Sequence, residues 1–177
     1  MGGRDAPFIP TVNEEEFIWR VPEKWYPFSK VSDEKTDTYF FPTGQDPNNW
    51  DESLHFVHYT STLGVTDAYQ VYEIRTQGAA ATCATHETDI AKQEVENGYS
   101  MMQWTDICVS SEGDFQYTTN KVVLGNEKLY MASKIWKSMP REHRTKRWHD
   151  YFDQTYVCDP TTENNPCRPP GRPSDRR

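Results

Sequence analysis

The chain has 177 residues, a length that fits one domain with a sizeable core. Its formal net charge of −8, from 27 acidic and 19 basic side chains, argues against a general phosphate-binding surface and therefore against nucleic acid as a partner. Aromatic residues reach 14% although hydrophobic residues make up only 35%, and disordered chains are poor in aromatics, so we expect a packed, aromatic-rich core.

The two ends of the chain differ in composition from its middle. Residues 1–13 are rich in Gly and Pro, and residues 168–177 are mostly Arg and Pro, so we expect a flexible N-terminal segment and a disordered C-terminal tail around one domain over 14–167. No stretch approaches the roughly 20 apolar residues that cross a bilayer. The first residues lack the apolar core of a secretory signal, so an exported protein would have its signal absent from this chain.

The first part of the domain reads as a meander of short strands. Turn-forming residues separate four β-prone runs, which cover residues 16–21, 25–28, 36–41 and 54–60. In the last run, His55 and His58 fall on opposite faces, so they cannot share a metal ion without a β-bulge. We therefore interpret both histidines as residues that fill the strand.

The second part combines helices with hairpins. A helix is predicted over 67–77, capped by Thr66 and stopped at Gly78. Two hairpins follow, one joining strands near 89–96 and 99–109 through the turn Asn97-Gly98, and one joining 115–123 to 128–136. A last helix, capped by Ser138, carries an aromatic stripe of Trp148, Tyr151, Phe152 and Tyr156. The order predicts the α+β class: an antiparallel β-sheet covered by helices, similar in layout to the PsbP/Mog1-like folds.

Four cysteines indicate the compartment. They form two plausible pairs, Cys83 with Cys108 and Cys158 with Cys167, and two disulfides would favour an extracytoplasmic location, in the periplasm or associated with the envelope. Three pairings are formally allowed, and four free thiols in a cytosolic protein are the alternative. Cys83 and His86 also have C-x-x-H spacing, but no second close pair of ligands accompanies them, so we expect no metal site.

Several short motifs resemble a group of small, uncharacterised bacterial envelope proteins, periplasmic proteins or lipoproteins, over about residues 17–157. The resemblance rests on Tyr39-Phe40-Phe41-Pro42-Thr43-Gly44-Gln45, Asn49-Trp50, Asn97-Gly98-Tyr99 with Trp104 and Cys108, and Gly125-Asn126-Glu127-Lys128-Leu129-Tyr130 with Trp136. It implies export and supplies no catalytic residues. This chain departs from that pattern because neither a signal nor a lipid-acceptor cysteine is found near its start.

Two sets of side chains are candidates for binding. Residues 134–149 hold six basic residues and one acidic residue, a net of +5, and within them a partner-binding face is expected at Lys137, Arg141, Arg144, Lys146 and Arg147. This face suits an acidic protein or an anionic membrane surface, whereas the plain alternative is a solvated helix face. An aromatic groove around Trp25, Trp50 and Trp104 could instead bind a small ligand or a glycan, although core and rim packing is the usual role of tryptophan.

The sequence shows none of the fixed-spacing motifs of hydrolases or nucleotide-binding enzymes. The leading hypothesis is therefore a non-enzymatic extracytoplasmic accessory or scaffold protein, which binds another protein in a membrane or envelope complex and carries no cofactor. A small-ligand or glycan-binding module is the alternative. A thiol-dependent enzyme using Cys83 and His86 is the third reading.

Overall fold

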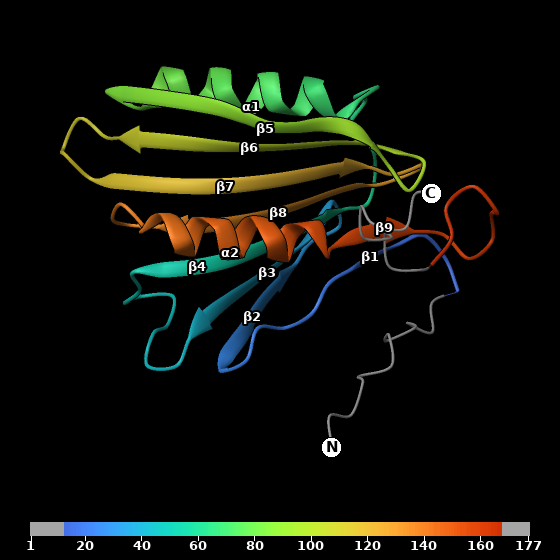
Figure 1. Ribbon diagram of the computed structural model, residues 1–177, viewed down its shortest axis with the longest axis horizontal. Helices are drawn as coiled ribbons and strands as arrows, with labels where there is room; N and C mark the ends of the chain where they lie inside the picture. The colour runs from blue at the N-terminus through green and yellow to red at the C-terminus, as the bar shows by residue number, and fades with distance from the viewer. Residues whose placement is uncertain (1–12, 168–177) are drawn as a thin grey trace.

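The computed structural model describes residues 13–167, so the flexible segment expected over 1–13, except Asn13, and the tail expected over 168–177 lie outside the described residues. Seven antiparallel strands form one sheet (Figure 1). Their order across the sheet is β2 (Trp25–Val31), β3 (Lys35–Pro42), β4 (Glu52–Tyr59), β8 (Leu129–Trp136), β7 (Phe115–Leu124), β6 (Tyr99–Val109) and β5 (Thr85–Glu96). Two consecutive meanders thus join where β4 pairs with β8.

The turn between β5 and β6 shows why the hairpin signal is strong. Asn97 and Gly98 have φ values of 50° and 84°, and both conformations are required by the two-residue turns that match the twist of a hairpin. Gly98 is needed for a second reason, because a Cβ there would lie 2.9 Å from the backbone oxygen of Asn164. The turn therefore also positions the end of the chain.

Two helices lie on opposite faces of the sheet. The helix α1 (Ala68–Thr82) packs over β5, β6 and β7, and α2 (Glu142–Asp153) packs against β7 on the other side (Figure 1). Neighbouring residues of β6 confirm the two faces, since Met102 belongs to the core cluster under α1 and Met101 to the cluster under α2. Each helix covers part of one face only. The fold is dominated by antiparallel sheet, and the expectation of a sheet covered by helices is corrected in that respect.

The helix boundaries differ from the sequence expectation. Asp67, not Thr66, accepts the capping hydrogen bond from the Gln70 backbone, and α1 continues through Gly78 to Thr82. The second helix begins at Glu142, four residues after the Ser138 that was expected to cap it, and has no side-chain cap. Pro140 explains why Ser138 is not the cap, because the residue before a proline, here Met139, is driven out of helical geometry.

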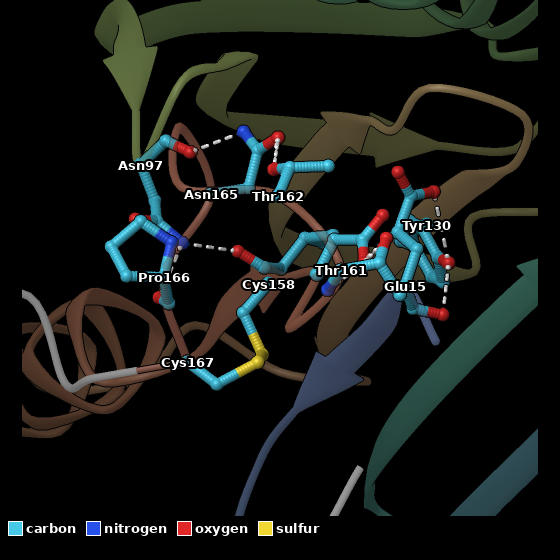
Figure 2. Close-up of a disulfide and its surroundings, with 11 residues drawn as sticks. Glu15, Asn97, Tyr130, Cys158, Thr161, Thr162, Asn165, Pro166 and Cys167 are labelled. Atoms are coloured by element: carbon cyan, nitrogen blue, oxygen red, sulfur yellow. Dashed lines mark hydrogen bonds between the residues drawn. A yellow bond between two sulfur atoms is a disulfide. The ribbon is translucent and has the colours of Figure 1, made fainter. Parts of the chain in front are cut away.

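The ends of the domain are held together by a separate two-stranded ribbon. The strand β1 (Glu16–Ile18) pairs with β9 (Tyr156–Cys158), although the sequence placed Tyr156 on the last helix. Residues 159–166, named here the C-terminal loop, follow β9 and are closed by the disulfide Cys158–Cys167 (Figure 2). The side chain of Asn165 donates to the Asn97 carbonyl oxygen at 2.8 Å, so the loop packs on the β5–β6 turn.

Both disulfides join the cysteines that the sequence paired. Cys83 is bridged to Cys108 with a Cα–Cα distance of 5.5 Å, and Cys158 to Cys167 with 4.9 Å. Because such bridges form and persist in oxidising compartments, they indicate an extracytoplasmic location. Among the described residues, no helix combines the length and apolar character needed to span a membrane.

Candidate functional site

The antiparallel order brings the beginnings of β2 and β4 and the ends of β3 and β8 to one end of the sheet. There, on the face that α2 occupies, a cavity of about 420 Å³ opens between β2 and α2. We name it the β2–α2 cavity; its lining residues are Pro22, Glu23, Trp25, Pro42, Glu52, Arg144, Arg147, Trp148 and Tyr151. Its size falls within the range of small-ligand sites.

Three charged side chains form a compact cluster at the inner wall of this cavity. Lys134 Nζ donates to Glu52 Oε2 at 2.7 Å, and Arg144 Nη2 donates to both Glu52 oxygens at 2.7 and 2.8 Å. Burial alone would raise the pKa of Glu52, but the hydrogen bonds and charges of Lys134 and Arg144 outweigh burial and hold the pKa below its usual value. Glu52 is therefore ionised at neutral pH, and the cluster keeps a net charge of +1.

Tryptophan rings surround the lysine of the cluster. Lys134 Nζ lies 4.1 Å from the ring centroid of Trp136, 5.1 Å from that of Trp148 and 5.2 Å from that of Trp25. The Lys134 side chain has no exposed surface, and burial lowers its pKa to about 8 although Glu52 acts in the opposite direction. Aromatic cages of this kind bind cationic ligands elsewhere, but here the protein's own lysine occupies the cage.

A second cavity, of about 430 Å³, lies on the other side of Arg144. Its lining comes from the end of β8, the segment that follows and the start of α2: Trp136, Ser138, Met139, Pro140, Arg141, His143 and Arg144. Arg144 lines both cavities. The two hollows are thus neighbours, separated by a guanidinium group that Glu52 holds in place.

The structure divides the expected partner-binding cations into two groups. Arg144 is half-buried and paired with Glu52. Lys137, Arg141, Lys146 and Arg147 are exposed, and within residues 13–167 none of them forms an ion pair. Lys146 differs from the other three because it lies four residues from both Glu142 and Asp150 on the helix, where opposite charges attract.

The three tryptophans of the expected aromatic groove are separated in the structure. Trp25 lines the β2–α2 cavity. Trp50 packs against Phe41 with Lys137 Nζ 4.1 Å from its ring centroid, and lines neither of the two cavities. Trp104 is fully buried on the opposite face of the sheet, beneath α1. One groove containing all three is therefore not what the structure shows, since Trp104 faces away from the other site residues.

The residues proposed for thiol chemistry have structural partners. Cys83 is bridged to Cys108, and His86 Nε2 lies 2.9 Å from Asp106 Oδ1. The other oxygen of Asp106 accepts hydrogen bonds from Trp104 Nε1 at 2.6 Å and from Asn120 at 3.0 Å. Within the part of the chain that the structure describes, no three His, Cys, Asp or Glu side chains gather as a metal site.

Sequence reasoning missed the acidic member of the site. Glu52 stands two residues before Leu54, so the strand alternation that places Leu54 in the core also turns Glu52 inward. Lys134 stands two residues before Trp136 and is turned inward for the same reason. A carboxylate and an ammonium group at inward positions of two strands need partners, and this was the available signal.

No known family model matches this chain, and no curated protein matches its sequence. Among solved structures, it is similar to one described as LpqN involved in cell envelope biogenesis of Mycobacterium tuberculosis, with 14% identity and a TM-score of 0.48. The match covers 86% of this chain and 89% of that chain. The function of this chain is therefore argued from its own residues, and the envelope family that its motifs resemble stays a prediction.

Proposed function

We propose that this protein is a non-enzymatic extracytoplasmic accessory protein, which binds an acidic segment of a partner protein in an envelope assembly. The observation that carries the proposal is the set of exposed cations Lys137, Arg141 and Arg147, named here the basic ridge. Arg147 lines the β2–α2 cavity and Arg141 the second cavity, whereas Lys137 lies between Trp136 and Ser138 of the second lining with its ammonium group over Trp50. None of the three forms an ion pair in the described residues, in a protein of net charge −8. A concentrated positive field on an acidic protein steers and orients an acidic partner.

The ridge is narrower than the basic segment read from the sequence. Lys134 and Arg144 are neutralised in part by Glu52, and Lys146 lies between Glu142 and Asp150 on another side of α2. The positive field that a partner meets therefore comes from the loop before α2 and from the side of the helix that faces β2. The two cavities lie on either side of Arg144, so an extended segment of the partner can reach both, whereas a single compact molecule would fill only one.

Binding without catalysis is supported by the state of the reactive side chains. The sulfur atom of Cys83 is committed to a disulfide, so it is not an available nucleophile. Both disulfides stiffen the domain, which suits a protein that presents a fixed surface to a partner.

The test is a matched pair of charge reversals in the native host. The tagged protein is cross-linked in cells, the envelope is solubilised gently, and stoichiometric partners are quantified by size-exclusion chromatography and mass spectrometry. We expect Lys137→Glu/Arg141→Glu to reduce the recovered partner roughly tenfold, because the field at the ridge changes sign. Lys146→Glu should leave recovery close to that of the unchanged protein.

Three results would contradict the proposal. Recovery of the partner could be the same in the double variant and in the unchanged protein, or it could fall equally with Lys146→Glu. The protein could also travel alone but sediment with anionic phosphatidylglycerol vesicles through the same ridge, which would replace the acidic protein with a membrane surface.

A further inference from the structure

We infer that the β2–α2 cavity is a separate binding site for an acidic sugar, a pyranose ring that carries a carboxylate. The site shares Arg147 with the basic ridge, but the inference does not depend on the partner protein proposed above. It rests on the chemistry that the lining offers together: a flat aromatic wall, free guanidinium donors and carboxylate acceptors.

The aromatic wall is provided by Trp25, Trp148 and Tyr151. Trp148 meets Trp25 edge to face with ring centroids 5.5 Å apart and meets Tyr151 at 5.0 Å, so the three rings support one another. The Tyr151 hydroxyl donates to the Arg20 carbonyl oxygen, which fixes the loop before β2 against α2. Trp25 remains half-buried, and its accessible surface lines the cavity, where the C–H groups of a pyranose can lie against the indole.

The guanidinium groups select an anion. Arg147 lines the cavity and forms neither an ion pair nor a side-chain hydrogen bond within residues 13–167, so none of its five N–H donors is used by these residues. Arg144 uses only Nη2 for Glu52, which leaves its Nε and Nη1 donors. Two guanidinium groups three residues apart on one helix match the planar, two-oxygen geometry of a carboxylate.

The carboxylates of the lining distinguish a sugar from a plain aromatic acid. Glu23 is exposed at the rim, and Glu52 forms part of the inner wall. Glu52 already accepts three hydrogen bonds from Lys134 and Arg144, so Glu23 is the main acceptor for a ligand hydroxyl and would repel a ligand that brings no donors. A uronate residue supplies hydroxyl donors to Glu23, a carboxylate to Arg147 and a C–H face to Trp25. The volume of about 420 Å³ suits one or two sugar rings.

The test uses digalacturonate as the probe and galactobiose as its neutral match, which has the same rings without carboxylates. Binding to the full chain is measured by calorimetry and by tryptophan fluorescence at low salt. We expect millimolar or tighter binding of digalacturonate and at least about tenfold weaker binding of galactobiose. Raising the salt concentration should weaken the first interaction and leave the second unchanged.

Variants locate the site. Arg147→Gln should weaken digalacturonate binding by about tenfold and spare folding, because Arg147 is exposed and unpaired within the described residues. Lys146→Gln removes the same charge on another side of α2 and should change the affinity by less than about twofold. Trp25→Ala should weaken digalacturonate binding and reduce the fluorescence response, to which Trp148 of the same wall also contributes, with folding checked by circular dichroism.

Opposite results overturn the inference. The first is equal affinity for the two disaccharides, and the second is an equal loss of digalacturonate affinity in Arg147→Gln and Lys146→Gln. The third is the absence of any calorimetric or fluorescence response to digalacturonate at about 10 mM. The charge reversals at Lys137 and Arg141 separate the two proposals, since neither residue lines the β2–α2 cavity. If these reversals release the partner protein while digalacturonate fails to bind the unchanged protein, the sugar site falls and the docking function stands.

Discussion

The stability of the protein above neutral pH tests the buried ion cluster most directly. Lys134 has a pKa of about 8 in the folded protein, against the usual 10.5 in an unfolded chain. Between these values the unfolded chain holds a proton that the folded protein has lost. The contribution of this group to stability therefore rises with pH across the window from 8 to 10.5. Lys134→Met removes the titrating group and fills the tryptophan cage with an unbranched apolar side chain.

The size of the effect follows from the two pKa values. The unfolded chain binds the Lys134 proton more tightly than the folded protein does. This lowers the free energy of unfolding by about 3 kcal/mol at about pH 7.5 and by only about 1 kcal/mol at about pH 9.5. The unchanged protein should therefore gain about 2 kcal/mol relative to Lys134→Met between these two conditions. The gain should be absent below about pH 7, where Lys134 is protonated in both the folded protein and the unfolded chain.

The assay is urea unfolding followed by far-ultraviolet circular dichroism, with both proteins measured at both pH values. Comparing the two proteins cancels the other titrations, including those of Tyr99 and Tyr130, whose pKa values are raised chiefly by burial. All four cysteines are bridged, so alkaline pH offers no free thiol to start disulfide exchange. A relative gain below about 0.5 kcal/mol, or a gain of opposite sign, would refute the reasoning.

Further predictions concern the covalent and backbone restraints. The pair Cys83→Ser/Cys108→Ser should cost more stability than Cys158→Ser/Cys167→Ser, roughly 3.5 against 2.6 kcal/mol, because the bridges close separations of 25 and 9 residues. Urea unfolding ranks the pairs, and a reversed order would contradict the chain-entropy argument. Gly98→Ala should lower the melting temperature by about 4 °C or more, since its φ of 84° is left-handed and a methyl group would meet the C-terminal loop. An unchanged melting temperature would show that the loop yields without cost.

The hairpins could be predicted because their signals are local. Alternation of apolar residues and the Asn97-Gly98 pair set both the strands and the turn, and the strand expected over 99–109 is the β6 that the structure shows. The separation of His55 from His58 follows from the same period of two. His55 meets Asp37 at 2.8 Å on one face, while the ring of His58 lies near that of Tyr130 on the other.

The pairing of the chain ends could not be predicted from local pattern. Phe17 is the register partner of Val157, and no short-range signal connects two segments 140 positions apart. Tyr156 follows Trp148 and Phe152 at helical spacing, so periodicity assigned it to the helix. Its real place in β9 is fixed by burial beside β1, a tertiary effect that outweighs the local spacing of aromatic residues.

The site was predictable in its charge and not in its geometry. The basic segment was visible because six cations stand within sixteen residues, but counting charges cannot tell which of them are paired. Pairing depends on Glu52, which is 82 residues before Lys134 and reaches it only because β4 lies beside β8. The tryptophans could likewise be found by counting. Which face of the sheet each one occupies depends on strand alternation, which places Trp104 under α1 and Trp25 beside α2.

Glu52 also decides how the two hollows beside α2 can act together. By holding Arg144 with two hydrogen bonds, it keeps the guanidinium between the cavities as a fixed wall, whereas Arg147 is free to follow a ligand. A ligand that drew Arg144 away would leave Glu52 with Lys134 alone, and a half-paired buried carboxylate is costly. Occupants of the two cavities should therefore bind beside Arg144 without moving it. The unpaired cations of the basic ridge, together with the net charge of +1 that the Glu52 cluster keeps, then set the charge that each occupant must carry.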